Sequence, residues 1–341
     1  MSDKIRAVMV GCGGISGSWF NCSAVKELVE FVGLVDLNPQ AAQARAQEFS
    51  FPDARIGADL DTVLAATTPE VVFNCTVPDA HYETTLTALR HGCHVLVEKP
   101  LADSMEHARA MVDAARQAGK IFAVIQNRRY DPNIRRLRAF LDSGAIGKLT
   151  TVHCRFLLDC YFGDDNFRTV MPHVLIHDMA IHTFDAARYL TRAIPHSAYC
   201  EEWNPSDSKY QRDVSAAAIF SMSDNIVYTY QGSWCPKGLN TTWESAWHII
   251  GERGSVYWDG PTFRAQALDS AGKMVDIAVP EIDLGEFRIF HDGNIHEFLT
   301  CLRTGHTPET IGSDNIHSLA MVLAAIESSI QEKKIAINIQ S

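Results

Sequence analysis

The sequence lacks the cysteine pairs and the long apolar runs that define several classes of protein. Its nine cysteines are scattered singly with no Cys-x-x-Cys pair, which argues against a zinc ribbon or a disulfide framework and fits reduced thiols. The apolar run in the N-terminal MSDKIRAVMV is too short for a signal peptide or a membrane span. We therefore expect a cytoplasmic protein that does not bind membranes.

Positive charge is also scarce. The 341 residues include 30 Lys and Arg against 41 Asp and Glu, a net charge of −11. Nucleic acids and anionic membranes require clustered basic side chains, so we expect neither as a partner, although backbone dipoles can still hold a small anion. With 46% hydrophobic and 21% charged residues, the composition is that of a globular protein, and the length suits two domains.

Short apolar runs alternate with helical stretches over the first 125 residues. The apolar runs are continuous, as in strands covered on both faces, and the helical stretches have apolar residues at three- and four-residue spacing. This alternation predicts right-handed crossovers and a parallel, doubly wound α/β sheet. The expected strands are 5–10, 31–36, 71–77, 94–99 and 120–126.

After residue 150 the pattern changes to a period of two. Three successive hairpins are predicted between residues 216 and 279, and they form an antiparallel sheet. Helical patterns at 287–303 and 314–333 follow, so the second half is α+β. The expected domains are 1–124 and 125–341. Strand 226–234 has apolar residues on both sides, which predicts that one face of this sheet is covered by a second copy in a homodimer or homotetramer.

The first expected strand leads directly into a glycine-rich turn followed by a helical stretch. Such a turn lets the backbone approach a pyrophosphate, and the helix supplies free N–H groups and the positive end of its dipole. On its own the string fits a structural turn equally well. Its place between strand and helix at the head of an α/β domain favours dinucleotide binding. The turn contributes Gly11, Gly13, Gly14, Ile15 and Ser16, the last in place of the usual Gly or Ala.

Asp36 ends the second expected strand. Its carboxylate can accept both hydroxyls of an adenosine ribose and would repel a 2′-phosphate. Leu37 and Asn38 follow, so no adjacent arginine is present to hold that phosphate. NAD is therefore favoured over NADP. The alternative is a solvated carboxylate with no function.

Two further segments end neighbouring strands of the predicted sheet. Open α/β sheets bind ligands at the carboxyl ends of their strands, so both segments should line one crevice. One contains Thr76, Pro78 and His81, and the other contains Glu98 and Lys99. A lysine that ends an apolar strand is either an extended surface cation or a catalytic one, and this position alone does not decide between them.

The segment from His173 to Asp185 is rich in histidine and aspartate. On a helix, Asp178 and His182 share one face, as do His173 and His177. A metal site is one interpretation, but no cysteine cluster or second histidine group supports it. A structural pair is another. Acid–base chemistry is favoured, because a catalytic histidine needs a carboxylate to fix its tautomer.

Together with Asn127 and Arg128 in the segment QNRRYDP, these motifs resemble the Gfo/Idh/MocA oxidoreductases over essentially the whole chain. One departure is Ala180, where many members have Gly. The resemblance implies a Rossmann domain (1–124) that binds NAD and a domain (125–341) with an open, mostly antiparallel sheet that binds substrate and forms oligomers. It also implies oxidation of a secondary alcohol on a sugar, sugar derivative or cyclitol.

Carried over by position, the catalytic group is Lys99, Asp178 and His182, with no metal. The expected cofactor residues are Gly11, Gly13, Gly14, Ile15, Ser16, Asp36, Leu37, Thr76, Pro78, His81, Glu98, Lys99, Asn127 and Arg128. The expected substrate residues are Lys99, Arg128, Asp159, Tyr161, Arg168, His177, Asp178 and His182. The same resemblance leaves two alternatives open, an NAD-assisted glycoside-cleaving enzyme and a non-catalytic regulator that binds NAD or sugar.

Overall fold

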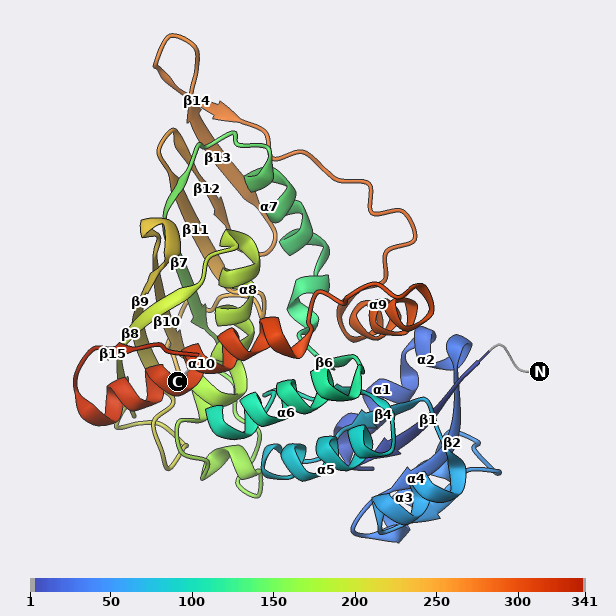
Figure 1. Cartoon of the computed structure of the whole chain (residues 1–341). Helices are drawn as coiled ribbons and strands as arrows, with labels where there is room; N and C mark the ends of the chain where they lie inside the picture. The colour runs from blue at the N-terminus through green and yellow to red at the C-terminus, as the bar shows by residue number, and fades with distance from the viewer. Residues whose placement is uncertain (1–3, 340–341) are drawn as a thin grey trace. The chain divides into compact units, whose positions relative to one another are not determined.

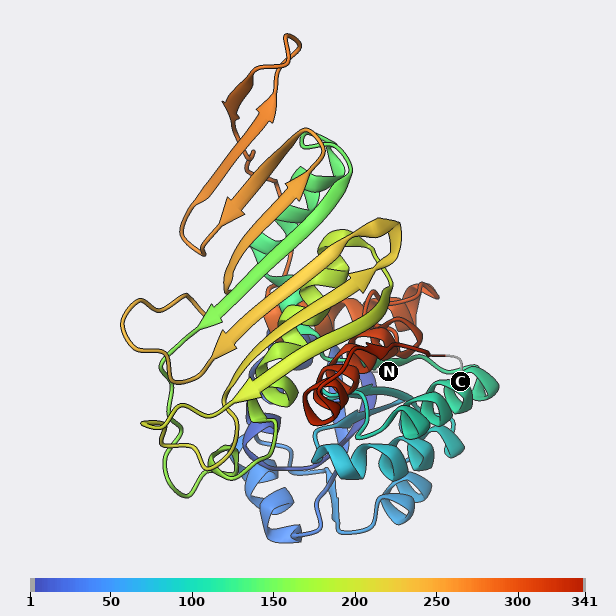
Figure 2. The same ribbon diagram turned by 90° about the vertical axis from the view of Figure 1, so that its left-hand side faces the viewer.

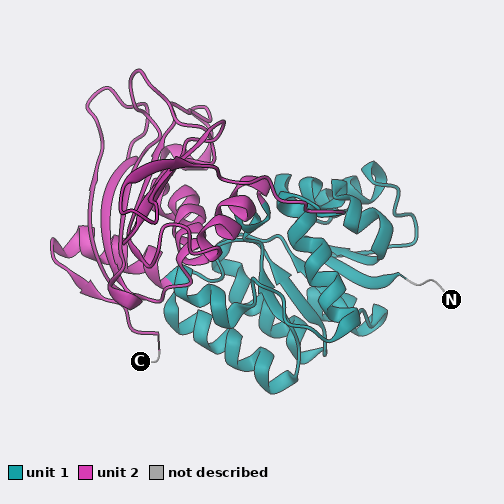
Figure 3. Ribbon diagram, turned by 90° about the horizontal axis from the view of Figure 1, so that it is seen from above, with its two compact units in different colours: residues 1–130, 286–319 teal, residues 131–285, 320–341 magenta. Residues whose placement is uncertain are grey.

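The computed structural model describes residues 4–339, which divide into two compact units (Figure 3). Unit 1 comprises the chain up to Tyr130 together with Glu286–Leu319, and unit 2 comprises Asp131–Gly285 and the chain from Ala320 onward. The division at 124/125 stays a prediction about domains. The compact units divide the chain at 130/131 and assign a later segment to the first unit. Each unit is described by itself.

Unit 1 is built on a six-stranded parallel sheet in the order β3-β2-β1-β4-β5-β6. All four residues of β4 are buried, as the continuous apolar run predicted for a strand covered on both faces. The strands are β1 (Ile5–Val10), β2 (Val29–Val35), β3 (Arg55–Gly57), β4 (Val71–Asn74), β5 (His94–Val97) and β6 (Phe122–Val124). The predicted α/β class is confirmed.

Helices connect the strands of unit 1 and cover the sheet. They are α1 (Gly14–Asn21), α2 (Ser23–Leu28), α3 (Pro39–Glu48), α4 (Leu60–Thr67), α5 (Pro78–Arg90), α6 (Met105–Ala118), the 3₁₀ helix η1 (Asn127–Tyr130) and α9 (Phe290–Thr304). One apolar cluster joins alternate residues of β1 to α1, α2 and α9. Helices α5 and α6 pack against each other (Figure 1). In the described part of the chain, no helix is both long and apolar enough to cross a bilayer.

The segment 286–319 belongs to unit 1 because side chains of η1 hold it there. Arg129 is buried, donates to the carbonyl oxygen of Glu309 at 2.7 Å and forms an ion pair with Asp314 at 2.7 Å. Tyr130 stacks on Phe287 with ring centroids 6.2 Å apart. These contacts join residues far apart in the sequence, so local patterns gave no sign of them.

Unit 2 is built on a nine-stranded sheet in the order β14-β13-β12-β11-β7-β10-β9-β8-β15. All neighbouring pairs are antiparallel except β7 and β10, which are parallel. The three predicted hairpins form, and the open, mostly antiparallel sheet is confirmed. The strands are β7 (Leu149–Leu157), β8 (Pro195–Trp203), β9 (Ser215–Met222), β10 (Val227–Ser233), β11 (Ala246–Gly251), β12 (Gly254–Trp258), β13 (Phe263–Leu268), β14 (Met274–Ile277) and β15 (Ile335–Ala336).

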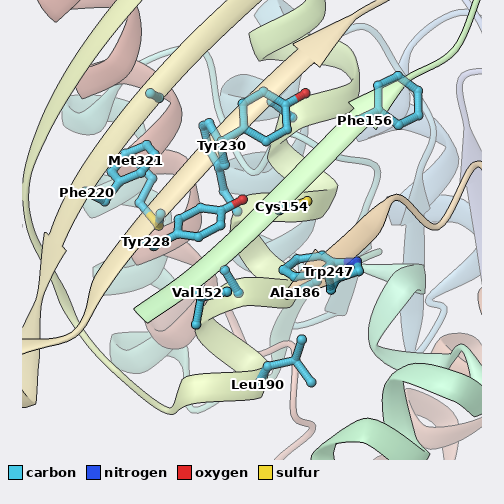
Figure 4. Packing of buried hydrophobic residues seen from close by; sticks show 14 of the residues in the cluster. Val152, Cys154, Phe156, Ala186, Leu190, Phe220, Tyr228, Tyr230, Trp247 and Met321 are labelled. Atoms are coloured by element: carbon cyan, nitrogen blue, oxygen red, sulfur yellow. The ribbon is translucent and has the colours of Figure 1, made fainter. Parts of the chain in front are cut away.

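Helices cover one face of this sheet. Figure 2 shows the strands in front, with α7 (Pro132–Asp142) and α8 (Ile181–Thr191) behind them. Phe184 of α8 packs against Phe220 and Tyr230, with ring centroids 4.8 and 5.2 Å away. Helix α10 (Gly312–Gln331) adds Met321 to the same core (Figure 4). The remaining helical segments are η2 (Phe167–Thr169), the π-helix η3 (Leu175–Ala180) and η4 (Ser223–Asn225).

The opposite face of the sheet presents large side chains to solvent within unit 2. Tyr199, Ile219 and Val227 are 38%, 51% and 39% exposed. Along β10 the burial alternates, with Tyr228 and Tyr230 buried between more exposed neighbours. A groove of about 510 Å³ crosses this face over β7, β8, β9 and β10.

Candidate active site

The glycine-rich turn of unit 1 has the shape that a pyrophosphate requires. Gly11 has φ +85°, and a Cβ there would lie 2.5 Å from the carbonyl carbon of Cys75, so no other residue fits. A Cβ at Gly13 or Gly14 would meet nothing within 4 Å. No side chain caps the N-terminus of α1, which begins at Gly14. This open backbone with uncapped N–H groups fits a dinucleotide phosphate.

Ser16 replaces the third glycine of the usual pattern without disturbing the turn. Its side chain is buried, and its hydroxyl donates to the carbonyl oxygen of Gly13 at 2.7 Å. Ile15 beside it is 37% exposed. The departure from the pattern therefore adds a hydrogen bond within the turn.

Asp36 connects the end of β2 to this turn. One carboxylate oxygen accepts from the backbone N–H of Cys12 at 2.8 Å and the other from that of Asn38 at 2.8 Å. A carboxylate has about four lone-pair sites, so acceptor capacity remains for ribose hydroxyls. Leu37 is 94% exposed.

Arg45 of α3 also reaches the turn, and sequence reasoning missed it. Its guanidinium donates to the carbonyl oxygens of Cys12 at 3.4 Å and Gly13 at 2.9 Å, and it pairs with Glu48. Arg45 does not follow Asp36 directly, so the residues next to that strand end give no sign of an arginine near the turn. Its charge is already shared with two carbonyls and a carboxylate.

The buried carboxylate of Glu98 fixes the residue that follows it. Glu98 is 6% exposed and accepts from the indole N–H of Trp19 at 2.8 Å and from the backbone N–H of Lys99 at 3.1 Å. The Lys99–Pro100 peptide is cis. Glu98 therefore joins α1 to the end of β5 and positions the half-buried Lys99.

His81 is a structural link within unit 1. It is fully buried, and its ring nitrogens lie 2.8 Å from the carbonyl oxygen of Pro100 and 3.1 Å from that of Thr76. Burial lowers the pKa of His81. The half-buried Thr76 and Pro78 lie nearer to solvent at the same strand end. His81 holds the loops after β4 and β5 together and is closed to solvent.

A second histidine, His291 of α9, lies beside the residues predicted to border the nicotinamide, and the sequence gave no sign of it. Its Nδ1 is 3.3 Å from the side-chain amide of Asn127. Burial, followed by the charges of Arg128 and Lys99, lowers the pKa of His291 to about 4. This histidine is therefore neutral at physiological pH. Its place in the site depends on α9 packing against η1, a contact between distant parts of the sequence.

In unit 2, Asp178 forms a two-pronged ion pair with Arg168. Nε of Arg168 lies 2.6 Å from one carboxylate oxygen, and Nη2 donates to the other at 3.2 Å. The guanidinium also stacks over the rings of Phe162 and Phe167, 4.8 and 4.6 Å from their centroids. Asp178 lies in η3, and His182 is half-buried in the first turn of α8.

His173 does not share a helical face with His177, so that expectation is wrong. His173 precedes the helix and has φ +52°, in the left-handed region. Its Nδ1 pairs at 2.7 Å with Glu202 of β8, whose side chain is 1% exposed. This pair holds the strained residue that leads into η3, while His177 is half-buried within η3 itself. Within residues 4–339, no group of three or more His, Cys, Asp or Glu side chains is arranged to hold a metal ion.

The two remaining substrate candidates lie on the loop after β7. Asp159 is exposed, and its backbone N–H donates to the side-chain oxygen of Asn240 at 3.3 Å. Tyr161 is half-buried and its hydroxyl donates to Asp164. Of the expected substrate residues, Lys99 and Arg128 lie in unit 1, and the others lie in unit 2, namely Asp159, Tyr161, Arg168, His177, Asp178 and His182.

Comparison with protein families agrees with both units. Residues 5–126 match the model of an oxidoreductase family with an NAD-binding Rossmann fold, and residues 134–257 match that of the GFO/IDH/MocA C-terminal domain. The chain belongs to the GFO/IDH/MocA oxidoreductase family. The resemblance read from its motifs is therefore confirmed.

Relatives within the family include sugar and cyclitol dehydrogenases. An uncharacterized protein of Sinorhizobium fredii is 26% identical over 95% of this chain and 93% of its own length. The D-glucoside 3-dehydrogenase of Escherichia coli is 31% identical, over 55% of this chain and 54% of its own. The inositol 2-dehydrogenase of Pseudomonas syringae is 30% identical over 54% of each chain.

Solved structures of the family share the whole fold. An oxidoreductase of Agrobacterium radiobacter, solved with NAD⁺, L-tartaric acid and magnesium, has a TM-score of 0.83 at 21% identity and covers 98% of both chains. A levoglucosan dehydrogenase solved with NADH and levoglucosan has a TM-score of 0.79 at 18% identity, with 98% of this chain and 99% of that chain covered. At these identities the likeness shows the fold.

The His173–Glu202 pair predicts a pH dependence of stability in this family member. The hydrogen bond that His173 donates to Glu202 raises the pKa of His173 above its ordinary value of 6.5. A raised pKa contributes stability that is complete below pH 6.5 and is lost as pH rises through the folded pKa. Glu202→Gln should cost about 1–3 kcal/mol of unfolding free energy at about pH 6 and less at about pH 9.

Denaturant unfolding of the wild type and of Glu202→Gln at the two pH values measures the loss of unfolding free energy. Glu201→Gln is the matched control, because Glu201 is the exposed neighbour on the same strand. An equal loss of stability from Glu202→Gln at both pH values would contradict the charged pair.

Proposed function

We propose that the protein is an NAD-dependent dehydrogenase that oxidises a secondary hydroxyl of a sugar, sugar derivative or cyclitol. The observation that carries the proposal is Lys99, which the buried carboxylate of Glu98 positions at the carboxyl end of β5 in a member of this family. Asp178 and His182 supply the carboxylate and imidazole in the other unit. The named relatives that act on glucosides and inositol support this substrate class.

NAD, when bound, supplies the hydride acceptor at C4 of its nicotinamide. The alcohol must lose its proton as the hydride leaves, because a free alcohol has a high pKa, and a positioned base is needed to receive that proton. We assign this role to His182. Lys99 hydrogen-bonds the substrate oxygen as negative charge develops on it, and relays the proton.

Asp178 orients the imidazole of His182 and stabilises it once it is charged. Arg168 binds both carboxylate oxygens of Asp178 but leaves about two of its four lone-pair sites for other donors. Arg168 is therefore a positioning residue for Asp178. The expected substrate contacts of Arg128, Asp159, Tyr161 and His177 remain part of the proposal.

The catalytic assignment predicts a split between binding and turnover. Lys99→Met should leave the NAD affinity nearly unchanged, since the proposed phosphate contacts come from the turn at residues 11–16. It should lower turnover by about 10²–10⁴-fold, as expected for the loss of a positioned proton-transfer group. His182→Ala should do the same. The double variant should lose less than the product of the two effects, because both residues serve one proton path.

Isothermal calorimetry with NAD and single-turnover rates on each variant measure both quantities. The wild-type oxidation rate should rise from about pH 6 to about pH 9 as the acid–base group deprotonates. Full activity in a folded Lys99→Met variant would refute the assignment. Loss of NAD affinity and stability together would instead indicate a structural role.

Asp36 predicts a preference for NAD over NADP. Its carboxylate would repel a 2′-phosphate, and the cation of Arg45 is already bound by carbonyls and Glu48. Asp36→Ser combined with Leu37→Arg should narrow or reverse the preference, because it replaces the repulsion with a phosphate-binding arginine. Calorimetry with both cofactors tests this. A tighter NADP constant for the wild type would show that the interpretation of Asp36 is wrong.

We further propose that the exposed face of the nine-stranded sheet binds a second copy of the chain in the cytoplasm. All nine cysteines are free thiols, as expected in a reducing compartment. Tyr199 and Ile219 on this face are exposed apolar side chains of the kind that oligomers bury.

Light scattering at micromolar concentration should give a multiple of the 37.8 kDa chain mass. Tyr199→Asp with Ile219→Asp should shift the protein toward monomer, since each buries a charge in the interface. Leu239→Asp is the control, because Leu239 is 94% exposed on the loop between β10 and β11 and does not line the groove on that face. A wild-type protein that stays monomeric would overturn this proposal.

A further inference from the structure

A cavity of about 140 Å³ lies among three loops of unit 2. The loops follow β7, precede β9 and follow β10. Because β7 and β10 are parallel and β9 is antiparallel to β10, all three loops meet at the same edge of the sheet. Asp159 and Tyr161 lie on the first of these loops.

Aromatic rings form one wall of the cavity. Tyr210 meets Tyr161 edge to face at 5.6 Å and stacks near Trp234 at 6.1 Å. The Tyr210 hydroxyl donates to the carbonyl oxygen of Cys160 at 2.7 Å, which fixes the ring. The indole N–H of Trp234 is buried and meets no acceptor among residues 4–339. Trp234 therefore contributes its ring to the wall, and its N–H is closed to a ligand.

Charged groups also line the cavity. Asp159, Asp207 and Lys237 line the cavity, and Lys237 pairs with Asp207 at 3.4 Å. Lys209 lies 5.1 Å above the ring of Tyr161. Carboxylates accept hydrogen bonds from hydroxyls and ammonium groups donate to them. Aromatic rings together with charged groups suit a sugar ring, which has an apolar C–H face and a rim of hydroxyls.

The volume limits what the cavity can hold. Whole-ligand pockets usually measure about 300–1,000 Å³, so 140 Å³ is enough for one ring-sized group. Packed side chains connect the cavity to the proposed catalytic carboxylate. Trp234 contacts Phe162 edge to face at 5.2 Å, Phe162 lies beneath Arg168, and Arg168 holds Asp178.

We propose that this cavity is a distal subsite that binds the second ring of a glycoside whose first ring is oxidised. The inference rests on the proposed function for the first ring and refines it, because it assigns glycosides with a second sugar, in preference to free monosaccharides, as the substrate class. Tyr161, Lys209 and Asp159 determine this specificity.

The test is equilibrium binding to the NAD-loaded protein. Calorimetry compares each disaccharide with the methyl glycoside of its first ring, in gluco, galacto, manno and xylo configurations. At least one disaccharide should bind about tenfold more tightly than its methyl glycoside, as expected for a few added hydrogen bonds. Lys209→Ala and Lys237→Ala should each remove most of that gain and leave binding of the methyl glycoside unchanged. Lys273→Ala, at an exposed lysine in the turn between β13 and β14, is the control.

Two results overturn the subsite. One is that no disaccharide binds more tightly than its methyl glycoside, and the other is that the variants weaken both ligands equally. The proposed function is judged separately, by reduction of NAD with any sugar or cyclitol. Turnover of methyl glycosides without any gain from a second ring would keep the dehydrogenase and reject the subsite.

Discussion

The buried carboxylate of Glu98 connects the two parts of unit 1 that the proposed reaction needs. It accepts hydrogen bonds from the backbone N–H of Lys99 and from the indole N–H of Trp19. Trp19 lies on the helix that begins at the glycine-rich turn. A buried carboxylate is costly unless its acceptors are satisfied, and here both oxygens are bound. The turn that fits a pyrophosphate and the lysine proposed to meet the substrate oxygen are therefore positioned by one group. A change at Glu98 would disturb both.

Unit 2 positions the carboxylate of Asp178 through side-chain contacts as well. The chain that leads to Asp178 has an unfavourable backbone conformation at one residue. His173 has a left-handed backbone, which is unfavourable for a residue with a Cβ. The ion pair with the buried Glu202 offsets this cost where the chain turns into the π-helix of Asp178. Arg168 forms an ion pair with Asp178, and its guanidinium also stacks over the rings of Phe162 and Phe167. The carboxylate is oriented before any ligand arrives, as preorganised sites require.

Local patterns were enough for the fold class, the family and the motifs at strand ends, because each of these is written in a short stretch of chain. The Gly11 turn and the Lys99 strand end are of this kind. Arg45, His291 and the Arg168–Asp178 pair were not found, since they depend on contacts between distant segments. The left-handed His173 was misplaced on a helix because spacing alone does not show where a helix begins. The assignment of 286–319 to unit 1 depends on Arg129, whose partners follow it by many residues.

The environments of the histidines support the choice of acid–base group. His81 is sealed in the interior with both ring nitrogens beside carbonyl oxygens. Burial and two cations lower the pKa of His291 to about 4, so it stays neutral through the working range. The hydrogen bond to Glu202 occupies Nδ1 of His173 and raises its pKa. A general base must change its protonation state near the operating pH and must reach the substrate. His81 and His291 each fail one of these conditions, which agrees with the proposed assignment to His182.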